Sequence, residues 1–151
     1  HPLLDQTFSA SKGGGATLNG EPIHVSSQHA LKASLISAGM PTAFEQDARR
    51  QLRLFGRFSS RTHSVRRTGS TAWNLAMVAA GGFEVCFGTS INPWDAAAGV
   101  LLVREAGGKV TQLDGQPYDL YADTLLATNG HVHDEAERAI QEALGGPAAW
   151  A

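Results

Sequence analysis

The chain has 151 residues, of which 42% are apolar and 17 are glycine, enough for one domain with a substantial core and short for two. Its net charge of −2 gives no overall attraction to nucleic acid or to an anionic membrane. No apolar run reaches membrane-spanning length, and the single cysteine, Cys86, cannot form an internal disulfide. We therefore expect a protein of a reducing, cytoplasmic environment with no membrane partner.

Short strands are expected at the start of the chain, over residues 7–11, 16–18 and 22–25. Asn19-Gly20 separates two of them and is a strong hairpin signal. The glycine triplet at residues 13–15 lacks the Lys-Ser/Thr pair and the helix that follow in a phosphate-binding loop. We interpret it as a tight turn.

A buried strand is expected over residues 33–37, followed by a helix over residues 43–58 that Thr42 caps. Five apolar residues of this helix lie near helical spacing on one face. They are Phe44, Ala48, Leu52, Phe55 and Phe58.

An arginine-rich stretch begins within that helix. Seven arginines occur with no acidic residue among them: Arg49, Arg50, Arg53, Arg57, Arg61, Arg66 and Arg67. This arginine stripe could bind nucleic acid or another anionic partner. We interpret it as a solvated surface because no aromatic or glycine-rich nucleic-acid motif is interleaved with it, so nucleic acid is not the expected partner. An interaction module that uses the Arg49 to Arg67 stripe remains the alternative hypothesis.

A second helix is expected over residues 72–80, opened by Ser70 or Thr71 directly after Gly69. Helix starts of this kind present free N–H groups, which can bind a phosphate or sugar hydroxyls. An ordinary Ser/Thr cap explains the same residues equally well.

The most informative segment is the helix that begins at or just before Asp95. Pro93 suits the first turn, and the Asp95 carboxylate there meets free backbone N–H groups and the positive end of the helix dipole. Small residues at 96–99 leave room for another backbone or a bound ion, and Gly107-Gly108 ends the helix. From spacing alone, Asp95 is a helix cap, with a metal-ligand role as the alternative. In the strand before this helix, over residues 83–87, Glu84 is expected to face solvent.

The remaining pattern predicts strands over residues 109–113 and 124–128 and a closing amphipathic helix over residues 132–144. His131 and His133 form a His-x-His pair, but no third ligand is near in the sequence, so we do not expect a metal there. Strands alternate with helices after Ala33. The fold class is therefore α/β, with a mixed β-sheet flanked by helices.

Residues 94–108 have the pattern Trp-Asp-x-Ala-Ala-Gly-x-Leu-Leu-x-x-Glu-Ala-Gly-Gly. This pattern resembles the C-terminal signature of the inositol monophosphatase family of magnesium-dependent, lithium-sensitive phosphomonoesterases. Residues 69–81 and 13–20 are similar to further motifs of that family, and the resemblance extends over roughly residues 7–139. It implies that residues 1–151 are one domain, the C-terminal half of a layered αβαβα sugar-phosphatase fold.

The resemblance also implies an activity and a site. The parent enzyme would use Mg²⁺ to hydrolyse a phosphate monoester of a small polyol or sugar, with Asp95 as a metal ligand and Gly69, Ser70 and Thr71 at the substrate. The family's other metal carboxylates belong to motifs upstream of the position of His1, so the N-terminal half is a missing partner. No catalytic residue is assigned within this chain, and the chain alone is expected to be inactive.

Two positions depart from the family's inositol-specific pattern. Gly88 stands where those members carry a Glu that contacts ring hydroxyls, and Met40 stands where a hydroxyl residue is common. Strict specificity for myo-inositol phosphate is therefore not expected. Apolar surface left uncovered by the missing half also favours a homo-oligomer.

Overall fold

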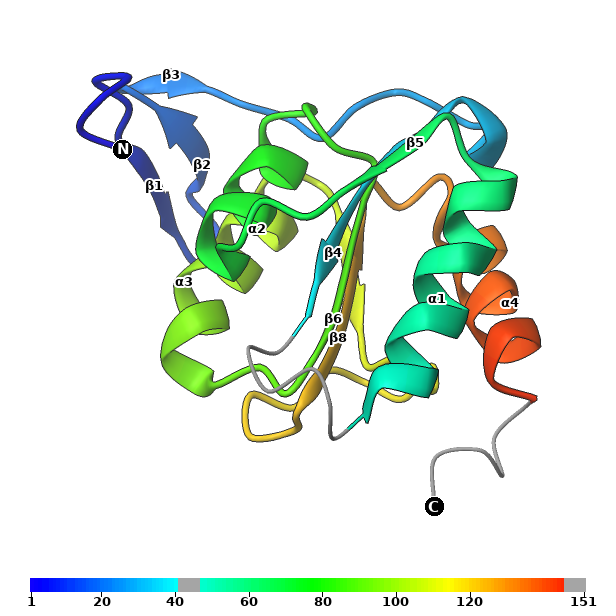
Figure 1. Ribbon diagram of the computed structural model, residues 1–151. Helices are drawn as coiled ribbons and strands as arrows, with labels where there is room; N and C mark the ends of the chain where they lie inside the picture. The colour runs from blue at the N-terminus through cyan, green and yellow to red at the C-terminus, as the bar shows by residue number, and fades with distance from the viewer. Residues whose placement is uncertain (41–46, 146–151) are drawn as a thin grey trace.

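The computed structural model describes residues 1–40 and 47–145. Within them, two β-sheets alternate with two pairs of helices, as Figure 1 shows. The layered α/β architecture predicted from the sequence is confirmed. None of the helices in the described part of the chain combines the length and the apolar character needed to cross a membrane.

The first layer is a small antiparallel sheet of order β1-β2-β3. Its strands are β1 (Phe8–Ser11), β2 (Gly15–Leu18) and β3 (Glu21–Pro22). The third strand is shorter than predicted, because the Val25 N–H donates to the carbonyl oxygen of Ala106 at 3.1 Å instead of continuing the sheet. Val25 thereby ties the small sheet to the helix layer behind it.

The second sheet is mixed and has the order β5-β4-β6-β8-β7. Its strands are β4 (Leu35–Gly39), β5 (Ser64–Arg66), β6 (Val85–Thr89), β7 (Lys109–Thr111) and β8 (Thr124–Thr128). β5 and β6 both run parallel to β4, whereas β8 is antiparallel to β6 and to β7. A short 3-10 helix, Leu31–Ala33, precedes β4. Every residue of β6 and β8 is buried, as expected for strands with helices on both faces.

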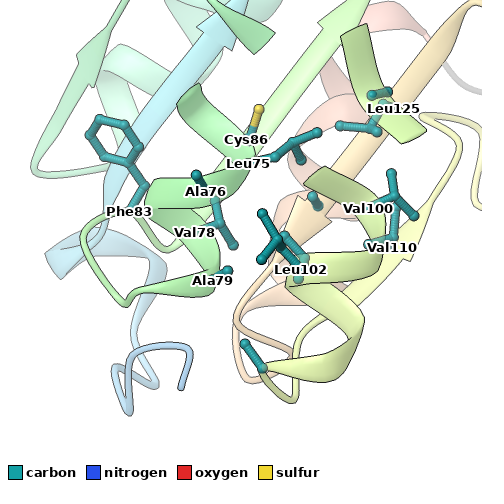
Figure 2. Close-up of a cluster of buried hydrophobic side chains, with 14 of the residues drawn as sticks. Leu75, Ala76, Val78, Ala79, Phe83, Cys86, Val100, Leu102, Val110 and Leu125 are labelled. Atoms are coloured by element: carbon teal, nitrogen blue, oxygen red, sulfur yellow. The ribbon is translucent and has the colours of Figure 1, made fainter. Parts of the chain in front are cut away.

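Helices α2 (Thr71–Ala79) and α3 (Pro93–Glu105) cover one face of the mixed sheet, and α1 (Ala48–Arg61) and α4 (His133–Leu144) cover the other (Figure 1). Alternate residues of β6 enter different cores. Cys86 lies in the core that Figure 2 shows, with Leu75 of α2 and Val100 of α3. Phe87 lies in the other core, where its ring stacks on Phe58 with centroids 4.7 Å apart.

The orientation of α1 differs from the sequence prediction. Its buried residues are Gln51, Leu54 and Phe58, whereas Leu52 is 60% exposed. The predicted face is thus right for Phe58, and Phe55 also packs against this core, but it is wrong for Leu52 because the buried face is centred nearer Leu54. Thr42 and Phe44 lie outside the described residues.

Glu84 is buried, contrary to the solvent-facing position that the alternating pattern predicts. Only 9% of it is exposed, and its Oε2 accepts the backbone N–H of Leu35 at 2.6 Å. Glu84 directly precedes β6, so its carboxylate reaches the first residue of the neighbouring strand β4. The charge joins the two central strands and does not face water.

A buried histidine fastens α4 to the sheet. The two ring nitrogens of His133 lie 3.2 Å from Thr111 Oγ1 and 2.9 Å from Thr128 Oγ1. The pKa of His133 is lowered to about 4, first by burial and then by the nearby Lys109, with Asp134 partly opposing both. The imidazole is therefore neutral in the folded protein at pH 7.

We predict that this histidine makes the fold acid-sensitive. The pKa of His133 falls on folding from 6.5 to about 4, so its contribution is complete above pH 6.5 and lost as the pH falls toward 4. The free energy of unfolding should drop by at most about 3 kcal/mol across this interval. Urea unfolding between pH 7 and pH 4 measures the effect, and His133→Gln should show a shallower dependence. Equal pH dependence in the two proteins would contradict the assignment.

Candidate functional site

The carboxyl ends of β4 and β6 meet the N-terminus of α2. Gly39, the last residue of β4, pairs with Gly88 of β6. A Cβ added at Gly39 would lie 3.5 Å from the Gly88 Cα and 3.8 Å from Thr71 Oγ1. Since α/β sheets bind ligands beyond the carboxyl ends of their strands, this end of the mixed sheet is the candidate site.

Gly69, Ser70 and Thr71 form the start of α2 at this site. Gly69 has a φ of +86°, which favours glycine. Ser70 is the helix cap, because its Oγ accepts the Trp73 N–H at 3.3 Å. Among the described residues, the N–H groups of Thr71 and Ala72 have no hydrogen-bond acceptor. They remain available for a phosphate or hydroxyl oxygen.

A buried asparagine that the sequence reasoning missed supports this loop. The Thr68 hydroxyl donates to Asn74 Oδ1 at 2.6 Å, and the Ser70 N–H donates to the Thr68 hydroxyl at 3.4 Å. Asn74 is fully buried in α2. A polar residue within an otherwise apolar helix was the available signal, since most buried polar atoms have a hydrogen-bond partner. Asn74 Oδ1 has one in Thr68, whereas Asn74 Nδ2 has none among the described residues.

Asp95 lies in the first turn of α3, as predicted. The N-cap is Asn92, and the Asp95 N–H donates to the Asn92 carbonyl oxygen at 3.0 Å. The Asp95 carboxylate is exposed, and its Oδ2 accepts the Asn92 side-chain amide at 3.2 Å. Asp95 is thus not the helix cap, and its carboxylate keeps oxygen lone pairs for another partner.

Asp95 suits a magnesium ion as one ligand of several. Carboxylate oxygens are the ligands that Mg²⁺ prefers, usually together with bound waters. However, the described residues contain no group of three or more His, Cys, Asp or Glu side chains that could hold a metal ion. Glu84 accepts a backbone N–H, as Asp114 and Asp119 also do. The described residues by themselves therefore do not form a complete magnesium site.

A close contact between helices positions Asp95 relative to α2. A Cβ added at Gly99 of α3 would lie 2.5 Å from the Leu75 Cβ of α2, and Ala96 beside it is fully buried. The small residues of α3 therefore accommodate another helix at this point. Leu75 lies in the buried cluster of Figure 2, between the two helices and the sheet.

The glycine turn before β2 has its N–H groups already occupied. Gly13 and Gly15 donate to the two carboxylate oxygens of Glu105, at 2.9 and 3.0 Å. These two hydrogen bonds lower the pKa of Glu105, since they favour its charged form. The interpretation of this segment as a turn is supported, and Glu105 serves to fasten the small sheet to α3.

The arginine stripe is partly neutralised within the fold. Arg61 lies 3.1 Å from the Glu142 carboxylate of α4, and Arg57 pairs with the same carboxylate. Arg50 lies 3.6 Å from Asp47. The pairs of Arg57 and Arg61 join α1 to α4, and the pair of Arg50 lies in the first turn of α1. Three of the seven arginines thus have a structural explanation.

A model of the inositol monophosphatase family matches residues 1–145. The chain belongs to the inositol monophosphatase family. An inositol-1-monophosphatase of Synechocystis is 39% identical over 140 residues, which are 93% of this chain and 49% of that protein. A fructose-1,6-bisphosphatase/inositol-1-monophosphatase of Thermotoga maritima is 36% identical and is matched over 95% of this chain and 54% of its own. Nus factor SuhB of Escherichia coli is 37% identical over 87% of this chain and 49% of its own.

Solved structures of the inositol monophosphatase family share this fold. An inositol monophosphatase from Anabaena has a TM-score of 0.90 and 39% sequence identity, over 93% of this chain and 56% of its own. The chain thus spans about half the length of the relatives it matches. The recognition from the Trp94–Gly108 pattern is confirmed at the level of the family.

We predict that Gly99 is indispensable for the packing of the two helices at the site. Gly99→Ala should lower the free energy of unfolding by about 1–3 kcal/mol, because the new methyl group would overlap Leu75. Gly56→Ala is the matched control, since a Cβ at this position in α1 meets nothing within 4 Å. The control should gain about 0.5–1 kcal/mol from the better helix propensity of alanine. Chemical denaturation measures both, and a neutral Gly99→Ala would disprove the close contact.

Proposed function

We propose that this chain is the C-terminal half of a magnesium-dependent phosphatase that hydrolyses a phosphate monoester of a small polyol or sugar. The observation that carries the proposal is the exposed Asp95 carboxylate in the first turn of α3. Helix α3 follows β6, whose Gly88 pairs with Gly39 of β4, and Gly39 lies beside Thr71 at the start of α2. Family membership supports the class of reaction.

The roles of this chain's own residues follow from their positions. Asp95 would hold magnesium, and the N–H groups of Thr71 and Ala72 would donate hydrogen bonds to substrate oxygens. Ser70 is the N-cap of α2, and the first N–H groups of a helix have no acceptor within it. A bound Mg²⁺ would supply Lewis-acid stabilisation of the negative charge on the phosphate and lower the pKa of a bound water.

The proposal includes an incomplete site in the isolated chain. Several carboxylates must converge to hold catalytic Mg²⁺, and the described residues contain no group of three or more side chains that could hold a metal ion. The others would come from the half of the relatives that this chain does not match, and the two halves would act together. A cytoplasmic location belongs to the same proposal.

Exposed apolar side chains indicate a surface of this chain that another protein segment would cover. Trp94, one residue before Asp95, is 79% exposed, and Leu3 is 91% exposed. A pocket of about 400 Å³ beside β1 is lined by Phe8, Trp73 and Leu102, among others. Apolar surface of this kind is costly to leave in water, so we expect the missing half or a second copy to cover it.

The function as a nucleic-acid-binding module is not proposed. The ion pairs of Arg50, Arg57 and Arg61 explain part of the stripe without a partner. No other observation in the described residues favours nucleic acid over a phosphate ester.

In the full-length enzyme, we predict that Asp95→Asn abolishes magnesium-dependent turnover. The substitution removes one negative charge from the metal site and keeps the shape of the side chain. The rate should fall by at least about 100-fold, equivalent to roughly 2.7 kcal/mol of transition-state stabilisation. Asp114→Asn, at an exposed turn, is the matched control and should retain activity. Phosphate release within about tenfold of the parent would refute the ligand assignment.

Substrate choice is expected to depend on Gly88 and its neighbour Ile91. A Cβ added at Gly88 would lie 2.7 Å from the Ile91 Cδ1 and 3.2 Å from the Gly39 carbonyl oxygen. An apolar side chain therefore occupies the space beside Gly88. Gly88 offers no carboxylate to the hydroxyls of a polyol substrate. A charge-assisted hydrogen bond of this kind contributes about 1.5–3 kcal/mol, so its absence should lower the discrimination in favour of inositol phosphate.

We predict that the full-length enzyme is not a strict myo-inositol phosphatase. In a screen against glycerol, sugar and histidinol phosphates, inositol 1-phosphate should be favoured by less than about 100-fold in kcat/KM. Gly88→Glu should raise the relative preference for inositol 1-phosphate by roughly 10- to 100-fold if Ile91 moves aside. Parent selectivity of 100-fold or more for inositol 1-phosphate would overturn the prediction.

A further inference from the structure

The two histidines of the His-x-His pair have different surroundings. His133 is buried between two threonine hydroxyls, whereas His131 is exposed and lies beside His29. The ring centroids of His29 and His131 are 4.0 Å apart, with 41° between the ring planes. Within the described residues, the imidazoles of His29 and His131 have no hydrogen bond to another side chain or to the backbone, unlike the imidazole of His133.

A hydrogen-bonded asparagine fixes the two segments that carry these histidines. Asn129 donates from Nδ2 to the carbonyl oxygens of Ser26 and Gln28, at 3.1 and 2.8 Å. Its Oδ1 accepts the N–H groups of His131 and Val132, at 3.1 and 3.2 Å. Asn129 is itself buried. The backbone on both sides of the imidazole pair is therefore held in place, although about a hundred residues separate the two in sequence.

A second contact joins the same two segments and adds negative charge. Glu135 of α4 accepts the Leu31 N–H at 3.2 Å, and Asp134 and Glu135 both lie in the first turn of α4. Their carboxylates offset the positive end of the helix dipole, and Asp134 also pairs with Lys109 at 3.4 Å. A cation between the histidines would thus not face an uncompensated positive field.

The histidine pair lies at the opposite end of the mixed sheet from the candidate phosphatase site. Thr128, the last residue of β8, pairs with Val85, the first residue of β6. Gly88, near the other end of β6, belongs to the candidate site. The loop from β8 to α4 is accordingly far along the strands from Gly88, at the end where β4 and β6 begin (Figure 1).

We propose that His29 and His131 form a binding site for a divalent transition-metal ion such as Zn²⁺, with water molecules as the other ligands. Two neutral imidazoles suit Zn²⁺ or Cu²⁺, with metal–nitrogen bonds of about 2.0–2.1 Å. Rotation of the two exposed side chains brings one nitrogen from each to a shared ion. Mg²⁺ would not bind here, since it requires oxygen ligands. The bound ion would link the segment before β4 to the loop before α4 and stabilise the fold.

Zinc titration of this chain tests the proposal. All proteins should carry His1→Ala, because an N-terminal histidine offers an amine and an imidazole of its own. Calorimetry should find one saturable Zn²⁺ site, and Zn²⁺ should raise the Tm because it binds the folded state preferentially. Loss of a group that only supports a metal ligand lowers metal affinity by about 10- to 100-fold. His29→Ala or His131→Ala removes a proposed ligand itself, so each should weaken Zn²⁺ binding by at least about tenfold.

His24→Ala is the matched control, since His24 is exposed and has no ring partner among the described residues. It should leave the zinc affinity unchanged, and Mg²⁺ in place of Zn²⁺ should not raise the Tm. The proposal is overturned if the double variant His29→Ala/His131→Ala binds Zn²⁺ as the parent does. It is equally overturned if the parent shows no saturable site below about 1 mM Zn²⁺.

Discussion

The close contact between α2 and α3 is the constraint on which the arrangement of the candidate site depends. Gly99 and the neighbouring small residues let Leu75 pack directly against the α3 backbone. Interiors are packed too densely to absorb an extra methyl group without a shift of one helix. Because α2 carries the N–H groups of Thr71 and Ala72 and α3 carries Asp95, a shift of either helix changes the distance between these groups. Packing at Gly99 thereby sets the relative position of the two parts of the candidate site.

Most of the Trp94–Gly108 motif serves the fold, and only a small part of it serves chemistry. Glu105 holds the Gly13 to Gly15 turn through two backbone hydrogen bonds. A Cβ at Gly108 would lie 2.5 Å from the Thr128 carbonyl oxygen, so only glycine allows the chain to pass β8 there. Of the two carboxylates in the motif, Glu105 is engaged by backbone N–H groups, whereas Asp95 is exposed and, among the described residues, accepts only the Asn92 side-chain amide. The length of the motif therefore reflects how many contacts are needed to hold one carboxylate at a strand end.

Local patterns predicted the elements of the fold well, because turn residues and apolar periodicity act within a few positions. The strand at residues 124–128, the Ser70 cap and the helix that contains Asp95 all appear as predicted. The errors arose where a distant segment decides the environment. Glu84 is buried because the start of β4 needs an acceptor, and Leu52 is exposed because Gln51 and Leu54 face the sheet instead. The pairing of His29 with His131 depends on tertiary structure that spacing does not contain.

We propose that this chain holds one ligand of a magnesium site that other residues must complete. The most direct measurement is magnesium-dependent phosphate release by the purified 151-residue chain, alongside the same chain with Asp95→Asn. We expect that neither protein releases phosphate above background at saturating Mg²⁺, because a single carboxylate binds this ion weakly. Clear release by the parent chain that disappears in the variant would contradict it.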